Sequence, residues 1–204
     1  MHHDTTLAGH GIRLVPLALD HAPALLNLID PALWAGMITP VPRTVDQMAG
    51  VIGQCLDAPD RLGFTVLGAD SGEVRGSSWF YDVHHGQERC EIGNTFYGRQ
   101  WWGGHTNPAC KLLMLTHAFD MWGMHRVALR ADTRNTRSIG AITRMGAVPE
   151  GVLRGHRVGP DGSRGDTAYF SILAPEWPPV RARLLDRLGA DRPADQASDT
   201  SIPS

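Results

Sequence analysis

Apolar residues recur along this chain at two spacings, and each spacing predicts one kind of element. Recurrence at every third or fourth position, with capping residues such as Thr44 and either Asn135 or Thr136 at the start, predicts amphipathic helices. Alternation of apolar and polar positions between turn residues predicts strands. The predicted helices cover residues 20–28, 44–56, 107–119, 135–145 and 178–188, and the predicted strands cover residues 12–17, 64–67, 74–81, 91–97, 126–131, 152–158 and 167–173.

The order of these elements predicts a mixed sheet flanked by helices, which is an α+β fold with α/β/α layers. Strands 64–67, 74–81 and 91–97 are joined by turn-forming residues and form an antiparallel meander. Strand 126–131 follows strand 91–97 through a long helix, so we expect these two strands to be parallel. The sequence Gly-Pro-Asp-Gly at 159–162 predicts a hairpin between the last two strands. Three prolines between residues 31 and 43 favour an irregular loop.

A glycine-rich bend precedes the helix at 107–119. Gly103 and Gly104 carry no Cβ, so the backbone can turn sharply and another molecule can approach it closely. Asn107 suits the N-cap position and Pro108 suits the first helical position. The unpaired N–H groups of a first helical turn favour a phosphate. A tight loop with no ligand explains the glycines equally well.

Composition and charge narrow the class of protein. The chain has 204 residues, of which 42% are hydrophobic and 20% charged, which is typical of one globular domain. The net charge of -2 argues against nucleic-acid binding, and no apolar run is long enough to span a membrane. Three widely spaced cysteines match neither a disulfide framework nor a zinc site, which favours a cytoplasmic location and no metal. We expect a flexible N-terminus at 1–9, one domain at 10–188 and a disordered tail at 189–204.

Several motifs, taken in their order and spacing, carry a resemblance to a known family. They include E-I-G-N-T-F at 91–96, W-W-G-G-H-T-N at 101–107, D-T-R-N-T-R-S at 132–138 and F-S-I-L-A-P-E-W-P at 170–178. Together they resemble the GNAT superfamily of acetyl-CoA-dependent N-acetyltransferases, most closely its RimJ/RimL-like branch. The resemblance covers residues 11–188. It implies the GNAT fold, whose mostly antiparallel sheet holds one splayed pair of parallel strands, here 91–97 and 126–131.

The resemblance also implies how acetyl-CoA is bound. Backbone groups of the first splayed strand would contact the pantetheine, and amides of the bend would hold the pyrophosphate. Asn135, after the second strand, would form a hydrogen bond to the cofactor, with a helix cap as its alternative. Ser138, one helical turn further on, would reach the thioester sulfur, with an ordinary first-turn serine as its alternative. The family's loop pattern places a small residue where this chain has His105, whose side chain either crowds the pyrophosphate or points outward. The implied cofactor-binding residues are Thr95, Phe96, Tyr97, Gln100, Gly103, Gly104, His105, Thr106, Asn107, Asn135 and Ser138.

Three residues are candidates for the chemistry that the resemblance implies. Glu91 is the candidate general base, acting through water, because partial burial on its strand would raise the pKa of its carboxyl. An ion pair with Arg89 or a neighbouring strand is the alternative. Ser138 is the candidate for protonating the thiolate, and Tyr169 is a second candidate acid, with core packing as its alternative.

Two functional hypotheses follow from these residues. The first is an N-acetyltransferase that moves the acetyl group from acetyl-CoA to a primary amine by direct attack. The amine is a protein N-terminus or a small molecule, and a homodimer is possible by family likeness. The second is a non-catalytic acyl-CoA-binding or regulatory module with the same fold.

Overall fold

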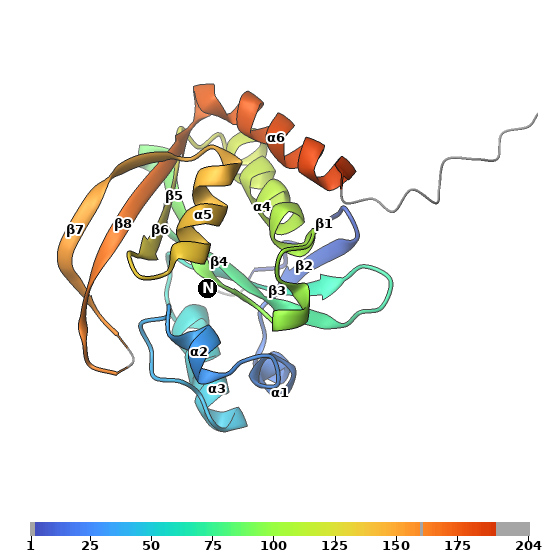
Figure 1. Cartoon of the computed structure of the whole chain (residues 1–204). Coiled ribbons are helices and arrows are strands. Elements are labelled where there is room, and N and C mark those ends of the chain that lie inside the picture. Colours follow the sequence, from blue (N-terminus) through green and yellow to red (C-terminus); the bar gives the residue numbers. More distant parts are fainter. Residues whose placement is uncertain (1–2, 160, 191–204) are drawn as a thin grey trace, which may run out of the picture.

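The computed structural model describes residues 3–159 and 161–190, and an eight-stranded sheet forms its centre (Figure 1). The strands lie in the order β1-β2-β3-β4-β5-β6-β8-β7, and every neighbouring pair is antiparallel except β5 and β6. The strands are β1 (Leu7–Gly9), β2 (Ile12–Pro16), β3 (Leu62–Gly68), β4 (Val74–His84), β5 (Arg89–Tyr97), β6 (Arg126–Asp132), β7 (Val148–Val158) and β8 (Arg164–Leu173). The predicted fold class, with its meander and its single parallel pair, is confirmed.

Helices cover both faces of the sheet. They are α1 (Ala22–Leu26), α2 (Pro31–Trp34), α3 (Val45–Leu56), α4 (Thr106–Thr116), α5 (Thr136–Met145) and α6 (Trp177–Ala190), and α4 continues into a short π-helix at His117–Met121. One buried cluster joins the sheet to α4, α5 and α6, and a second cluster joins its other face to α1, α2 and α3. Figure 1 shows α4 and α6 side by side, and their residues are in contact.

A β-bulge in β5 changes which face its side chains occupy. The register with β4 shifts between Trp79↔Gly93 and Ser77↔Phe96, so β5 carries one extra residue there. Asn94 has φ 45° within this segment. Because the side-chain period of a strand is two, one extra residue reverses the faces beyond it. Ile92 therefore packs in the α4 cluster, whereas Phe96 packs in the cluster of α1, α2 and α3.

The parallel strands β5 and β6 pair over only part of their length. Their paired positions are Arg89↔Arg126, Cys90↔Val127 and Glu91↔Ala128. Beyond this point, β5 continues to Tyr97 and β6 to Asp132 without pairing to each other. The splayed pair implied by the family resemblance is present, and the gap between the strands opens after Glu91.

Several predicted boundaries differ from the structure. Residues 7–9, expected to be flexible, form β1 against β2. The expected loop at 31–43 begins with helix α2, because Asp30 caps it through the backbone N–H of Leu33 and a proline suits its first position. Helix α6 includes Gly189, and the rest of the expected tail, 191–204, lies outside the described residues, as do residues 1–2 and Pro160 of the expected hairpin turn.

The start of α4 also differs from the prediction. The helix begins at Thr106, and His105 is its N-cap residue, with a carbonyl that accepts a hydrogen bond from the amide of Ala109 at 2.9 Å. Asn107 therefore lies in the first turn and is not the cap. Pro108 does not oppose this earlier start, because the N–H groups of the first helical turn have no partner within the helix.

Candidate functional site

A cleft of about 710 Å³ lies where β5 and β6 separate. Residues 92–97 of β5 and 129–132 of β6 line it, together with parts of the bend at 101–104 and of α2, α4, α5 and β7. Its size is within the range of small-molecule and cofactor sites. The lining found among the described residues contains seven Lys or Arg side chains but one carboxylate, that of Asp132. Such a cleft favours an anionic ligand.

One end of the cleft, here called the bend end, is formed by the glycine-rich bend and the start of α4. Gly103, Gly104 and Asn107 all line it. Gly103 has φ +76°, and a Cβ built at Gly103 or Gly104 meets no atom within 4 Å, so the bend is open to a ligand. Two of the predicted cofactor-binding residues, Phe96 and Tyr97, line the cleft. A third, Gln100, is exposed and does not line it.

The side chain of His105 turns away from the bend. Its Nε2 lies 3.2 Å from Nη1 of Arg75, and it faces the β1–β2 hairpin at Gly11, which would place a Cβ 3.5 Å from that nitrogen. Thr106 is buried beside it, and its hydroxyl lies 3.4 Å from the same Arg75 nitrogen. Neither residue lines the cleft. The outward orientation of His105 is thus the one found, and the ring does not crowd the bend.

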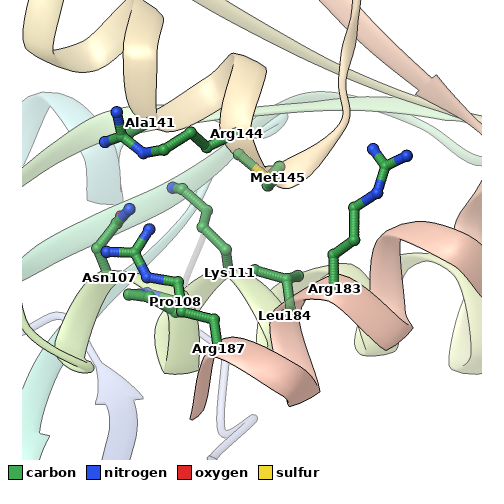
Figure 2. A pocket seen from close by; sticks show the side chains of 9 residues that line it. All are labelled: Asn107, Pro108, Lys111, Ala141, Arg144, Met145, Arg183, Leu184 and Arg187. Atoms are coloured by element: carbon green, nitrogen blue, oxygen red, sulfur yellow. The ribbon is translucent and has the colours of Figure 1, made fainter. Parts of the chain in front are cut away.

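Basic side chains converge on the bend end from three helices (Figure 2). Lys111 of α4, Arg144 of α5 and Arg187 of α6 line both the cleft and a small adjoining pocket that includes Asn107. Nη2 of Arg187 lies 3.5 Å from the carbonyl oxygen of Gly103. Within the described part of the chain, no carboxylate lies at ion-pair distance from any of these three cations. The positive charge at this end is therefore uncompensated.

Lys111 is a buried lysine with polar but uncharged partners. Its Nζ donates to the hydroxyl of Thr95 at 3.0 Å and lies 3.4 Å from the hydroxyl of Ser78. The two hydroxyls are also 2.7 Å apart and bond to each other. Burial lowers the pKa of Lys111, because removal from water disfavours its charged form. Thr95, a predicted cofactor contact, thus lines the cleft while its side chain is held by two other elements.

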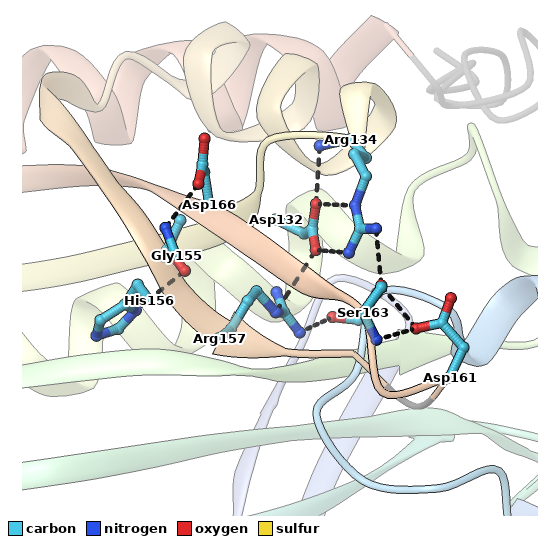
Figure 3. Close-up of polar contacts among 10 residues, drawn as sticks. Asp132, Arg134, Gly155, His156, Arg157, Asp161, Ser163 and Asp166 are labelled. Carbon is cyan, nitrogen blue, oxygen red and sulfur yellow. Dashed lines mark hydrogen bonds and ion pairs between the residues drawn. The ribbon is translucent and has the colours of Figure 1, made fainter.

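The opposite end, here called the hairpin end, is lined by Tyr81, Arg130, Asp132 and Arg157, close to the β7–β8 hairpin. Its charges are paired. Asp132 accepts from Arg134 at 2.8 and 2.9 Å, and Nε of Arg157 lies 3.5 Å from the same carboxylate (Figure 3). The hydrogen bonds from Arg134 lower the pKa of Asp132. These contacts tie β6 to β7 at the rim of the cleft.

Glu91, the candidate general base, lies behind the cleft wall. Its side chain is 7% exposed, and its Oε1 accepts from the phenol of Tyr81 at 2.7 Å and pairs with Nε of Arg130 at 2.9 Å. The alternative of an ion pair with a neighbouring strand is therefore the one found, with Arg130 of β6 as the partner, whereas Arg89 pairs with Asp82. Burial raises the pKa of Glu91, more than its hydrogen bond from Tyr81 and the charge of Arg130 lower it.

The other two catalytic candidates occupy different places. Tyr169 does not line the cleft, and its phenol accepts from Nη1 of Arg130 at 2.8 Å. Ser138 lines the cleft in the first turn of α5. Asn135 caps that helix, since its Oδ1 accepts from the backbone N–H of Ser138 at 3.0 Å, and it too lines the cleft. The cap alternative for Asn135 is therefore present, and its amide nitrogen lies against Gly36, which also lines the cleft.

Sequence patterns missed several residues of the site. Tyr81 stands opposite Glu91 in the β4–β5 register, a position that the strand boundaries alone do not reveal. Lys111 interrupts an apolar helix face, and this interruption is the sequence signal that could have identified it as a site residue. Arg187 lies on a helix far along the chain from the bend, so no local pattern indicates its contact with Gly103.

Two features are absent from the described residues. No three His, Cys, Asp or Glu side chains among them gather so as to hold a metal ion. None of the helices in residues 3–159 and 161–190 combines the length and apolar character needed to cross a membrane.

Comparison with known proteins shows which proteins this chain resembles. A solved protein from T. thermophilus, to which acetyltransferase activity is attributed, is 35% identical with a TM-score of 0.84, covering 92% of this chain and 99% of that one. A GCN5-related N-acetyltransferase from Brucella melitensis is 24% identical with a TM-score of 0.84, covering 98% and 90%. Mycobacterium smegmatis RimJ, solved with CoA-disulfide, is 22% identical with a TM-score of 0.76, covering 90% and 94%, and shares the fold.

A curated relative and a family model complete the comparison. The N-acetyltransferase p20 of Bacillus licheniformis, itself uncharacterized, is 28% identical over 115 residues, which are 56% of this chain and 63% of that protein. This chain thus matches less than two thirds of that relative's length. The model of the acetyltransferase (GNAT) domain matches residues 12–148, which include the splayed strands, the bend and α5. The chain belongs to the GNAT acetyltransferase family.

Proposed function

We propose that this protein transfers the acetyl group of acetyl-CoA to a primary amine, either a protein N-terminus or a small molecule. The observation that carries the proposal is the separation of β5 and β6 after Glu91↔Ala128, at the base of the cleft. Backbone N–H and C=O groups that face a gap lack strand partners on that side. A pantetheine chain, with its two amides, is suited to pair with such groups.

The bend end suits the phosphate-bearing half of the cofactor. Open backbone at Gly103 and Gly104 meets the first turn of α4, where N–H groups and the helix dipole favour an anion. The uncompensated cations Lys111, Arg144 and Arg187 add to this field. The outward orientation of His105 removes the objection that its side chain would occupy the phosphate position.

The reaction itself requires an amine to lose its proton, to attack the thioester carbonyl and to expel the thiol of CoA. Glu91 does not line the cleft, so it receives a proton through Tyr81, which lines the cleft and whose phenol already donates to the carboxylate. The raised pKa of Glu91 suits a proton acceptor at neutral pH. Ser138 stays the candidate donor to the departing thiolate, and Asn135 the candidate contact to the cofactor. Tyr169 accepts a hydrogen bond from Arg130 and so helps to hold the side chain of Arg130 in place.

The proposal is tested in two steps with the full chain. Calorimetry with acetyl-CoA measures binding, and a thiol-release assay with peptides of different N-terminal residues, amino acids and polyamines measures turnover. We expect binding and release of CoA with at least one class of amine. Binding without turnover on any amine supports the acyl-CoA-binding module instead, and absence of binding overturns both hypotheses.

The proton route through Tyr81 has its own readout. Tyr81→Phe keeps the ring but removes the phenol, so we expect kcat to fall while the affinity for acetyl-CoA stays the same. A general acid or base contributes about 10²–10⁴-fold to a rate. The pH at which kcat/KM rises should also change in Glu91→Gln. A pH profile that is unaltered in both variants would remove these two residues from the proton route.

A further inference from the structure

Arg144 and Arg187 approach the bend from two helices that are distant in sequence. Arg144 lies in the last turn of α5 and Arg187 in the last turns of α6. Figure 2 shows both guanidinium groups near Asn107, with the aliphatic stem of Lys111 between the two helices. These three basic residues and Arg183 line the same small pocket, together with Asn107 and Pro108 at the start of α4.

The neighbouring Arg183 behaves differently. Its guanidinium lies against Gly146, the residue that ends α5, where a Cβ would come within 2.3 Å of Nη1. A cation at a helix C-terminus interacts favourably with the helix dipole. Arg183 thus packs against the end of α5, and it lines the small pocket but not the cleft. Figure 2 shows it turned away from Asn107.

Arg144 and Arg187 differ from Arg183 because they line the main cleft as well as the small pocket. No carboxylate among the described residues pairs with either one, although both line the same pocket as the buried Lys111. Bringing like charges together is unfavourable unless an anion lies between them. Two guanidinium groups suit a phosphate monoester, which carries nearly two negative charges at neutral pH and accepts paired hydrogen bonds.

We propose that Arg144 and Arg187 form a clamp for the 3′-phosphate on the ribose of CoA, and that helix α6 thereby completes the nucleotide site. The inference rests on the proposed function. The diphosphate is assigned to the amides of Gly103 and Gly104. The two arginines line the cleft from α5 and α6, and Nη2 of Arg187 lies 3.5 Å from the carbonyl oxygen of Gly103. Residue 187 lies beyond residues 12–148, which the family model matches, so this contact is a feature of the chain outside that match.

The test compares acetyl-CoA with acetyl-3′-dephospho-CoA by calorimetry on the full chain. We expect the unaltered protein to bind acetyl-CoA at least about tenfold more tightly, as one or two charge-assisted contacts give. In the double variant Arg144→Gln, Arg187→Gln the preference should fall below about twofold, while the affinity for the dephospho compound stays the same. Arg181→Gln is the matched control, because Arg181 is exposed on α6 and lines neither pocket.

The possible results separate the two proposals. If the unaltered protein binds neither compound, the proposed function and the clamp both fail. If it binds both compounds equally well, only the clamp fails. If the double variant loses affinity for both compounds to the same extent, the arginines contact the diphosphate and the clamp is again overturned. Equal thermal midpoints for the variant and the Arg181→Gln control exclude misfolding as the cause.

Discussion

The two ends of the cleft both contain basic side chains, but they differ in how those charges are balanced. At the hairpin end, Arg130 pairs with Glu91, and Arg134 and Arg157 surround Asp132. At the bend end, the cations of α4, α5 and α6 have no carboxylate partner among the described residues. Paired charges hold strands in register, whereas unpaired charges retain their field for a ligand. This difference is the reason for assigning the phosphates of the proposed cofactor to the bend end.

A carboxylate placed in the bend should have the largest effect on this comparison. Gly104→Asp introduces a negative charge where the diphosphate is expected, and like charges in contact cost several kcal/mol. We expect acetyl-CoA affinity to fall by about 100-fold. The fold should tolerate the change, because a Cβ at Gly104 meets no atom within 4 Å and its backbone is outside the left-handed region.

The matched control is Gly104→Ala, which adds the Cβ without the charge. Its affinity for acetyl-CoA, measured by the same calorimetry, should stay within about threefold of that of the unaltered protein, since the added methyl group meets open space. If Gly104→Asp binds acetyl-CoA as tightly as Gly104→Ala does, the bend is not the phosphate site.

The sequence predicted the glycine-rich bend and, as an alternative for Glu91, an ion pair with a neighbouring strand, but it did not predict which residue forms that pair. The reason is the range of the interactions. Gly103, Gly104 and the helix that follows form one local pattern, and the strand on each side has its own periodicity. The partner of Glu91 depends on the register between β5 and β6, which places Arg130 beside it across separate segments. The start of α4 was misplaced because Pro108 is compatible with more than one position in a first helical turn.

Breaking the pair at the hairpin end should affect folding. Arg130→Met leaves the buried Glu91 carboxylate with the phenol of Tyr81, at 2.7 Å, as its remaining hydrogen-bond donor among the described side chains. We expect the free energy of unfolding to fall by about 2 kcal/mol at pH 7, below the full cost of a broken buried pair because Arg130 is 35% exposed. Urea denaturation followed by circular dichroism measures the loss.

The pH dependence of that loss identifies its cause. Burial already raises the pKa of Glu91 above its usual 4.5, and loss of the Arg130 charge, which lowers that pKa, raises it further in the variant. The extra cost of the ionised carboxylate is therefore fully present above the variant's pKa and declines as the pH falls from there towards the pKa of the unaltered protein. The gap in stability between Arg130→Met and the unaltered protein should therefore narrow on acidification. The double variant Glu91→Gln, Arg130→Met should regain stability at pH 7. An equal loss at every pH would point to lost packing instead.

The smallest effect is expected at Lys111, where a substitution should raise the stability of the fold but lower the affinity for acetyl-CoA. Burial lowers the pKa of this amine, so the unfolded chain binds its proton more tightly than the folded chain does. Below the ordinary pKa of 10.5, protonation of this amine thus favours the unfolded chain over the fold, and Lys111→Met should raise the free energy of unfolding at pH 7 by about 1 kcal/mol. Thr95 and Ser78 keep their mutual hydrogen bond in that variant.

The same substitution removes one of the unpaired cations at the bend end, so acetyl-CoA affinity should fall by about fivefold as stability rises. The stability gain should shrink as the pH approaches 10.5, where the amine of the unfolded chain also loses its proton. Leu112→Met, a neighbouring buried change without a charge, should alter neither property by much. If Lys111→Met instead destabilises the fold and leaves affinity intact, Lys111 is a structural residue, and the contrast between the two ends of the cleft depends on the arginines alone.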